Sequence, residues 1–334
     1  MTKWIISIGT GKSQRQLISQ AKHMGFKIIG IDRDPDVNLV DDNLKISTYS
    51  QQGIIKELGD TILNREIAGV ISRTSGPATL TAAKVSEFLK LPTATSIFAQ
   101  SVLSKSHLAK TAIRKNIETL KIVNIGQELV WDEGLDLVIK PDQPTLGKQN
   151  VYRVKSLSQY QDARKKAMNE SFNKKCICQK FVAGREIGIM IAVSRGRFLW
   201  HFIFEEIVEE LVGGKFQGIG VKGPASRLKP YVKKSLLSSC LKFIENLKAT
   251  GFLFFSFKVT EQNNIFLYEV NQGLSGDGIV DFLIPKIWPK VNFFELDVLL
   301  SIGEMPEFPS TALFSQKVHS YLINQPKKVS GTLC

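Results

Sequence analysis

The first ninety residues alternate short apolar runs with helix-like segments, and this alternation constrains the fold more than any other feature of the chain. Apolar strands are expected at residues 4–8, 27–31 and 67–72, and helices at residues 13–24 and 77–89. Strands that alternate with helices favour a parallel sheet covered on both faces, because each helix returns the chain to the same edge of the sheet. The N-terminal sequence therefore predicts a Rossmann-like unit.

The turn after the first strand partly matches a dinucleotide-binding motif. Gly9-Thr10-Gly11 opens a helix, and Asp32 ends the next strand 32 − 11 = 21 positions later, where such motifs place a ribose-binding acid. Gln14 stands where the third glycine belongs. We therefore favour a tight turn with a polar rim over a nicotinamide site, and an NAD(P)-dependent oxidoreductase remains a rival hypothesis.

The rest of the chain mixes strands and helices without a simple alternation, which is typical of an α+β arrangement. A glycine-rich stretch at residues 209–226 suggests a mobile loop, and the last twenty residues suggest a polar tail. The remaining expected elements are helices at residues 104–116, 157–168, 228–248 and 294–300, and strands at residues 137–140, 151–154, 176–181, 187–193, 198–204, 252–259 and 265–270.

Composition favours a soluble cytoplasmic protein that binds small anions. The formal net charge is +13, but the lysines lie in dispersed pairs and not in a basic block interleaved with aromatic residues, so we expect no nucleic-acid partner. No apolar run approaches the length of a membrane span, so we expect no membrane partner. Cys176, Cys178, Cys240 and Cys334 form neither a disulfide framework nor a zinc motif.

The segment 265–271 is an apolar strand that ends in a carboxylate and an amide. Side chains two positions apart on a strand point to the same face, so Glu269 and Asn271 emerge together. Two hard oxygen ligands suit Mg2+, which proteins usually hold with one or two carboxylates and substrate phosphates. The strand therefore predicts a magnesium site.

Two segments further upstream could bind the rest of a nucleotide. The strand 137–140 delivers Lys140, and the polar loop that follows contains Thr145, Gly147 and Lys148, so that lysine and loop could grip phosphates. An extended segment around residues 179–186 could offer backbone groups to an adenine edge, and Glu186 could accept ribose hydroxyls.

In this order the motifs resemble the ATP-grasp superfamily. The resemblance is carried by Val138-Ile139-Lys140-Pro141, by residues 181–186 and by Leu267-Tyr268-Glu269-Val270-Asn271. It implies a mixed α/β and α+β chain in which a Rossmann-like domain precedes a two-subdomain ATP-grasp fold. The implied boundaries are a Rossmann-like domain at 1–95, a small subdomain at 96–183, a large subdomain at 184–310 and a tail at 311–334.

The resemblance also assigns roles to individual residues. Lys105 and Lys140 match the two ATP-binding lysines, and residues 145–148 match the loop that covers the phosphates. Glu269 and Asn271 match the ligands of one or two Mg2+ ions. The adenine hinge and the ribose-binding acid of the family match Gln179, Lys180, Phe181, Val182 and Glu186.

Two positions depart from the family pattern. Ser256 stands where an acidic or amide metal ligand is usual, so it is at best a doubtful ligand, and Gly273 stands where an arginine is common. Lys258 is our first candidate to supply the missing positive charge, with Arg185 and Lys215 behind it.

The resemblance implies an ATP-dependent ligase that joins a carboxylate to an amine through an acyl phosphate, with amino acids as candidate substrates. The carboxylate is expected near Arg73, Thr74 and Ser75, because open parallel sheets bind ligands beyond the carboxyl ends of their strands. A phosphotransferase and a degenerate nucleotide-binding protein are the alternatives on the same fold. Homodimers are common in resembling families, so a homodimer is a further expectation.

Overall fold

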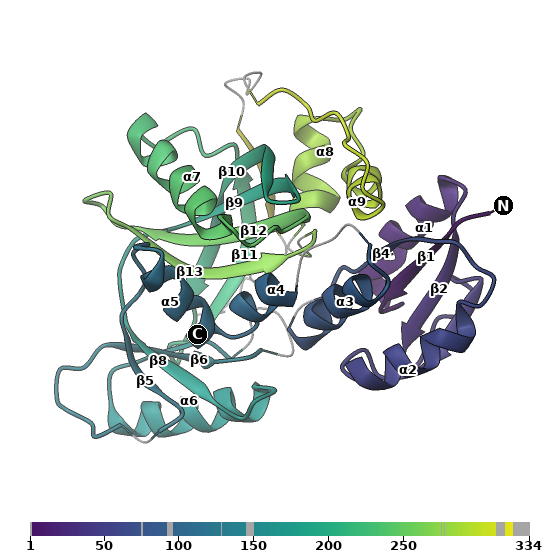
Figure 1. Ribbon diagram of the computed structural model, residues 1–334. Coiled ribbons are helices and arrows are strands. Elements are labelled where there is room, and N and C mark those ends of the chain that lie inside the picture. The colour runs from purple at the N-terminus through teal and green to yellow at the C-terminus, as the bar shows by residue number, and fades with distance from the viewer. Residues whose placement is uncertain are drawn as a thin grey trace, which may run out of the picture.

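The computed structural model contains three β-sheets (Figure 1), and a central cavity lies between two of them. One is a parallel sheet at the N-terminus, and the other two are antiparallel sheets of different size. The structure describes residues 2–74, 76–91, 96–127, 129–144, 150–274, 276, 278–311 and 318–322.

The N-terminal unit is a parallel sheet with helices on both faces. Its strand order is β3-β2-β1-β4. Isoleucines of β1 and β2 are buried alternately against helices on either side, which is why both strands are apolar along their length. Its elements are β1 (Trp4–Ile8), α1 (Arg15–His23), β2 (Lys27–Asp32), β3 (Asp42–Lys45), α2 (Gln51–Thr61), β4 (Ile67–Ile71) and α3 (Pro77–Phe88). The predicted Rossmann-like unit is confirmed.

Two helices lead from this unit to a four-stranded antiparallel sheet of order β5-β8-β6-β7. Helix α6 covers one face of that sheet through Tyr160, Ala163 and Ala167 (Figure 1). The opposite face borders the central cavity. The elements are α4 (Ser96–Val102), α5 (Lys105–Arg114), β5 (Ile122–Ile125), β6 (Leu137–Pro141), β7 (Tyr152–Val154), α6 (Leu157–Glu170) and β8 (Cys176–Lys180).

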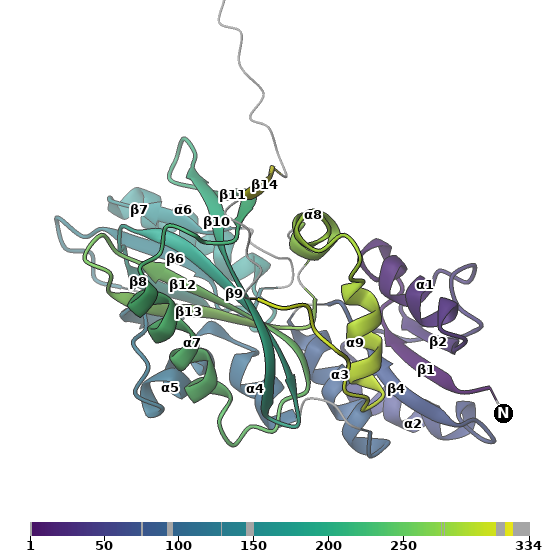
Figure 2. The same cartoon turned by 90° about the horizontal axis from the view of Figure 1, so that it is seen from above.

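The largest sheet has the order β13-β12-β9-β10-β11-β14. Helix α7 covers one face, while α8 and α9 pack on part of the other and α9 also contacts the N-terminal sheet (Figure 2). The elements are β9 (Arg185–Ser194), β10 (Arg197–Glu210), β11 (Phe216–Gly223), α7 (Pro230–Ile244), β12 (Gly251–Val259), β13 (Ile265–Gln272), a π-helical turn (Ile279–Leu283), α8 (Ile284–Ile287), α9 (Phe293–Ser301) and β14 (His319–Leu322).

The glycine-rich stretch 209–226 is not the mobile loop that its composition suggests, and that prediction is wrong. Most of it is the end of β10 and all of β11, which form a hairpin. The glycines are there for close packing: a Cβ on Gly220 would lie 2.4 Å from the carbonyl oxygen of Tyr321. The prediction of a tail is likewise wrong for β14, which pairs with β11. Residues 323–334 lie outside the described part of the chain.

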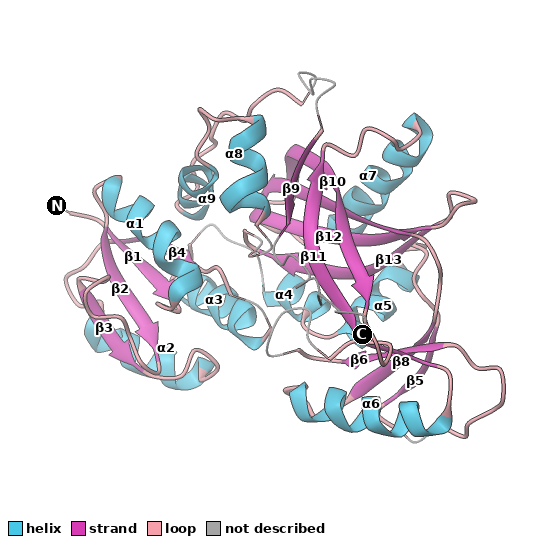
Figure 3. Cartoon of the chain, turned by 180° about the vertical axis from the view of Figure 1, so that it is seen from behind, coloured by secondary structure: helices cyan, strands magenta, loops and turns pink. Residues whose placement is uncertain are grey.

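The tip of this hairpin joins the two antiparallel sheets. The amide of Phe216 donates to Val151 O at 2.9 Å, and the amide of Arg153 donates to Gly214 O at 2.7 Å. The sheets therefore meet in backbone hydrogen bonds on one side of the cavity, with the smaller sheet lying beneath the larger one in Figure 3.

No helix among the described residues combines the length and apolarity needed to cross a membrane. Cys176, Cys178 and Cys240 are free and buried. Cys334 lies outside the described residues.

Candidate active site

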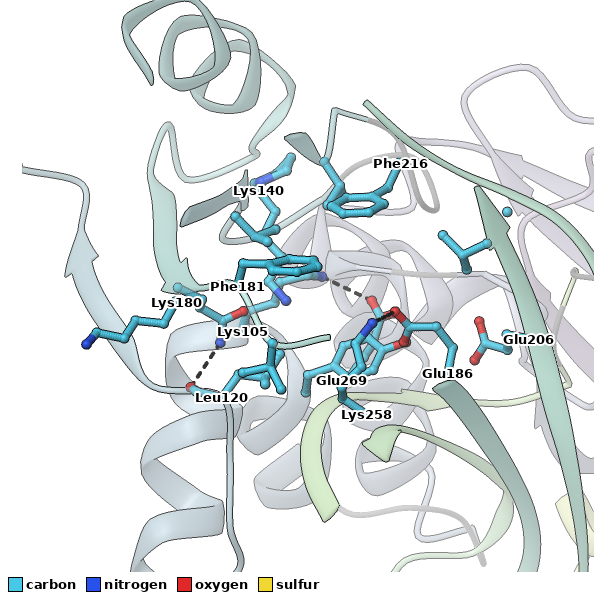
Figure 4. A pocket seen from close by; sticks show the side chains of 18 of the residues that line it. Lys105, Leu120, Lys140, Lys180, Phe181, Glu186, Glu206, Phe216, Lys258 and Glu269 are labelled. Atoms are coloured by element: carbon cyan, nitrogen blue, oxygen red, sulfur yellow. Dashed lines mark hydrogen bonds and ion pairs between the residues drawn. The ribbon is translucent and has the colours of Figure 1, made fainter. Parts of the chain in front are cut away.

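A cavity of about 920 Å3, including its open mouth, lies between the two antiparallel sheets (Figure 4). It gathers most of the described nucleotide-binding residues that the sequence predicts, from elements far apart in the chain. The predicted residues that line it are Lys105, Lys140, Gln179, Lys180, Phe181, Val182, Glu186, Lys258 and Glu269. Leu120, Val138, Pro141, Pro144, Val151, Glu206, Val208, Phe216, Gly218 and Tyr268 complete the wall.

Lys140 is a buried lysine in the wall of this cavity. It lies on β6, is 5% exposed, and its Nζ is 5.2 Å from the centre of the Tyr268 ring. Burial, and then the charge of Lys105, lower the pKa of Lys140 to about 7, although Glu269 and Glu186 oppose the change. A bound phosphate would stabilise the charged form, so this lysine is poised to bind an anion.

Lys105 begins helix α5 and reaches the same cavity. Ser104 caps the helix by accepting a hydrogen bond from the amide of His107. The carboxylate of Asp142, which follows β6, accepts from the amide of Ser106 at 2.8 Å. These contacts fix the start of the helix, and Lys105 Nζ lies 3.0 Å from Glu269 Oε1.

A β-bulge turns two consecutive residues of β13 toward the cavity. Ser256 pairs with Glu269, but the next residue, Phe257, pairs with Leu267, so Tyr268 is the extra residue. A bulge can bring neighbouring side chains to one face of a strand. Tyr268 and Glu269 both line the cavity as a result.

Glu186 and Lys258 form an ion pair across β9 and β12 in the cavity wall (Figure 4). Oε2 of Glu186 is buried and has no hydrogen-bond partner among the described residues. A buried carboxylate oxygen without a donor is costly, and a ribose hydroxyl could supply one. Burial, together with the charges of Glu186 and Glu206, raises the pKa of Tyr268 well above its usual range.

The segment predicted to bind adenine runs along the cavity edge. Gln179 is 3% exposed, and its Nε2 donates to Leu120 O at 3.2 Å while Oε1 has no partner among the described residues. The amides of Lys180 and Phe181 donate to Lys121 O and Asp136 O. The side chain of Lys180 points away from the cavity in Figure 4, so its contribution to the wall is mainly its backbone.

Phe181 also takes part in an aromatic and cationic contact between the two sheets. Its ring is nearly parallel to that of Phe216 on β11, with 6.4 Å between the ring centres. The Arg153 guanidinium lies 3.6 Å from the centre of the Phe181 ring and pairs with Asp136 and Glu210. These contacts hold the hairpin of β10 and β11 against the smaller sheet.

A second cavity lies between the N-terminal unit and the large sheet. It shares Lys105, Pro144 and Glu269 with the first cavity, so the two adjoin at one place in the wall. The second cavity is lined by Thr74 and Arg73, as predicted for the carboxylate substrate, and by Asn271 from β13.

Arg73 is 8% exposed and makes a two-pronged ion pair with Asp281, at 2.5 and 3.1 Å. Its guanidinium also lies 5.2 Å from the centre of the Phe294 ring. Asp281 belongs to the π-helical turn, so this contact ties the N-terminal unit to the region of α8. A substrate carboxylate would compete with Asp281 for Arg73.

The structure does not bring every predicted residue to the cavities. Arg185 is exposed, with Nη1 3.5 Å from Glu205, and neither Arg185 nor Lys215 is among the described residues that line the two cavities. Ser256 is 1% exposed and donates to Glu206 Oε1 at 2.8 Å. Thr145, Gly147, Lys148 and Ser75 lie outside the described residues.

Sequence reasoning missed Glu206, Tyr268 and Phe216. No local signal marks Glu206, because its partner Ser256 is fifty positions away. The bulge that exposes Tyr268 depends on pairing with β12. Phe216 could have been found if the glycine-rich stretch had been read as a hairpin.

The residues of the partly matching dinucleotide motif form a turn whose polar groups bond to other groups of the protein. The carboxylate of Asp32 accepts a hydrogen bond from the amide of Thr10 at 2.9 Å. Gln14 is buried and donates to Arg73 O at 2.9 Å. Gly9 has a φ of 95°, which favours glycine. Asp32 therefore already has a structural role in the turn.

The residues at the end of β13 fit a magnesium ion. Glu269 offers carboxylate oxygens and Asn271 an amide oxygen, and such hard ligands suit Mg2+ when phosphates complete the coordination. Among the described residues no group of three or more His, Cys, Asp or Glu side chains could hold a metal ion unaided. Glu269 and Asn271 supply two oxygen ligands, so phosphates would have to provide part of the coordination of such an ion.

These features define the class of fold: a Rossmann-like unit followed by two antiparallel α+β units around a lysine-bearing cavity. The chain has the ATP-grasp fold. At the level of sequence, it matches no protein-family model and no curated protein.

Three solved structures illustrate the likeness. An L-amino acid ligase from Bacillus licheniformis is 16% identical with a TM-score of 0.73, over 91% of this chain and 75% of the ligase. The N5-carboxyaminoimidazole synthetase from Staphylococcus aureus, complexed with ADP, is 12% identical with a TM-score of 0.69, over 92% and 79%. The biotin carboxylase domain of Hydrogenobacter thermophilus 2-oxoglutarate carboxylase, with MgADP, ADP and bicarbonate, is 13% identical with a TM-score of 0.70, over 92% and 71%.

Proposed function

We propose that this protein is an ATP-dependent ligase that joins a carboxylate to an amine and releases ADP and phosphate. The observation that carries the proposal is the contact between the two cavities at Lys105 and Glu269. A nucleotide in the first cavity would place its terminal phosphate beside a substrate in the second. Similar structures that are an amino acid ligase and an ADP-bound synthetase support this reaction class.

In this proposal the first cavity holds ATP. The adenine lies against the segment 179–182, and Glu186 accepts a ribose hydroxyl with the buried oxygen that lacks a partner. Lys140 and Lys105 bind the phosphates, because two cations in a confined, partly dry site offset negative charge more strongly than in water.

Glu269 and Asn271 would hold Mg2+, which would offset the negative charge of the phosphates when bound. Lys105 now pairs with Glu269 at 3.0 Å. If Glu269 held the metal, Lys105 would be available to the phosphates. The ion pair between Lys105 and Glu269 holds both side chains where the two cavities adjoin.

The reaction has two steps. A carboxylate oxygen of the first substrate attacks the γ-phosphorus, and the bond from that phosphorus to ADP breaks to give an acyl phosphate. The amine nitrogen of the second substrate then attacks the acyl carbon, the bond from that carbon to phosphate breaks, and the amine loses a proton. The protein contributes chiefly position, charge and the exclusion of water, which would hydrolyse the acyl phosphate.

The carboxylate occupies the second cavity, near Thr74 and Arg73. Because Asp281 already pairs with Arg73, we expect the substrate carboxylate to be bound by exchange of this ion pair. Amino acids are candidate substrates on both sides of the amide bond, by analogy with the L-amino acid ligase.

Release of ADP from ATP and Mg2+ in the presence of amino acids and small carboxylates, added singly and in pairs, tests the proposal. We expect ADP only with a specific carboxylate and amine together. A phosphorylated product made without an amine would indicate a phosphotransferase instead. ATP binding without turnover for any pair would indicate a degenerate nucleotide-binding protein, and reduction or oxidation of a nicotinamide would indicate the rival oxidoreductase.

A further inference from the structure

Ser256 occupies the position at which the ATP-grasp pattern usually has a metal-binding acid. Its side chain is hydrogen-bonded to the carboxylate of another residue, Glu206. Ser256 is 1% exposed, and its hydroxyl donates to Glu206 Oε1 at 2.8 Å. Glu206 lies on β10, fifty positions earlier in the chain, and is 6% exposed. The hydroxyl is therefore in contact with a carboxylate that comes from a different strand.

The register of the sheet explains how Glu206 reaches this position. Ser256 on β12 pairs with Gly188 on β9, and Glu206 on β10 pairs with Glu186 on β9. The strand between the two residues thus has a glycine beside Ser256. A Cβ on Gly188 would lie 2.1 Å from the ring of Phe204, so no side chain can stand there. The Phe204 ring covers Gly188, and the carboxylate of Glu206, two residues further along β10, extends across β9 to the Ser256 hydroxyl.

The same register places this carboxylate on the side of the sheet that holds the proposed metal ligand. Ser256 also pairs with Glu269 on β13, so the two side chains are cross-strand neighbours. Glu206 and Glu269 line the first cavity (Figure 4), and Tyr268 also belongs to its wall. Glu206 is therefore delivered to the region that an acid at position 256 would occupy.

We propose that Glu206 supplies an acidic ligand for the divalent cation, which Ser256 lacks, and that Ser256 orients the Glu206 carboxylate. This inference rests on the proposed function, because the cation arrives with the nucleotide. A neutral hydroxyl is a weak ligand for Mg2+, whereas a carboxylate is a preferred one. The hydrogen bond to Ser256 fixes one oxygen of Glu206, as neighbouring groups commonly do for metal-binding carboxylates.

Binding of Mn2+ to the full-length protein, followed by electron paramagnetic resonance with and without ADP, tests this inference without any catalytic turnover. In the presence of ADP, we expect Glu206→Gln to weaken Mn2+ binding at least about tenfold and Ser256→Ala to weaken it less. Glu205→Gln is a matched control, because Glu205 is the adjacent residue of β10 and pairs with Arg185 on the surface. It should bind Mn2+ as the wild type does.

Metal-free binding of ADP, measured by calorimetry in EDTA, separates a metal ligand from a structural residue. Glu206→Gln removes a negative charge from the first cavity, so this variant should bind metal-free ADP as tightly as the wild type or more tightly. A merely structural role would weaken ADP binding with and without metal. That result would overturn the inference.

A double variant that moves the carboxylate from position 206 to position 256 tests the inference independently of either single variant. Ser256→Asp alone would crowd a third carboxylate against Glu206 and Glu269, so we expect poor folding or weak metal binding. Combined with Glu206→Ser, it should restore Mn2+ affinity in the presence of ADP to within about threefold of the wild type. Equal Mn2+ affinity in the wild type and in Glu206→Gln would contradict this inference but not the proposed function. Failure of the folded wild type to bind ADP would contradict the proposed function itself.

Discussion

Replacement of the buried Lys140 by methionine should stabilise the fold at neutral pH while it destroys nucleotide binding. The pKa of Lys140 falls from 10.5 to about 7 in the folded protein, mainly through burial. One pKa unit corresponds to about 1.4 kcal/mol, so retaining a lysine here costs up to about 4 kcal/mol of folding free energy at pH 7. Methionine has a similar length and no charge to desolvate.

The sign of this effect depends on pH in a defined way. Between pH 7 and 10.5 the unfolded chain binds a proton at Lys140 that the folded protein has lost. The contribution of Lys140 to stability therefore becomes more favourable as pH rises through this window. The advantage of Lys140→Met over the wild type should be greatest at pH 7 or below and should shrink toward pH 10.

Urea unfolding followed by circular dichroism at pH 7 and pH 9.5 measures this difference. Lys165→Met is a suitable control, because Lys165 is an exposed residue of α6. The control should change stability little at either pH. If Lys140→Met is no more stable than the wild type at pH 7, or if its advantage does not depend on pH, Lys140 is not a buried, destabilised cation and our reasoning about the phosphate site fails.

Three further predictions concern pH and individual residues. Bound phosphate should restore the proton of Lys140, so calorimetry should show that the affinity for ATP falls as pH rises above 7. The Lys140→Arg variant stays charged and should lose this pH dependence. If its ATP affinity falls with pH as steeply as that of the wild type, the prediction is contradicted. Burial raises the pKa of Asp297 to about 7 against an ordinary value of 3.8, so folding favours its protonated form and stability is lost as pH rises from about 4 to 7. Asp297→Asn should accordingly be more stable than the wild type by up to about 4 kcal/mol in denaturant titrations at pH 8 and equal to it near pH 4, and no gain at pH 8 would refute this. Arg185→Ala should leave the rate of ADP release within about twofold of the wild type, because Arg185 is exposed and paired with Glu205; a larger loss would return Arg185 to the list of substrate-binding candidates.

Features that depend on a single strand could be predicted from the sequence. Lys140 and Gln179 each follow apolar residues in strands whose burial is evident from composition, and both line the first cavity. Glu269 and Asn271 could be placed on one face because strand geometry alternates.

Features that depend on contacts between strands could not be predicted. The glycines of β11 look like loop residues, yet Gly220 is needed because a neighbouring backbone approaches closely. The strand β3 is polar and lies at a sheet edge, so it lacks the apolar pattern that marks β1 and β2. Glu206 reaches Ser256 across β9, which no local pattern in either strand can reveal.

The transfer of an oxygen atom from the carboxylate substrate to phosphate tests the central claim most directly. The assay uses a carboxylate and amine pair that supports ADP release, with 18O in the carboxylate, and mass spectrometry of the inorganic phosphate. An acyl phosphate intermediate predicts one 18O in each phosphate released with an amide, because the carboxylate oxygen that attacks phosphorus leaves with it. Unlabelled phosphate would mean that water attacks ATP, and it would contradict the account.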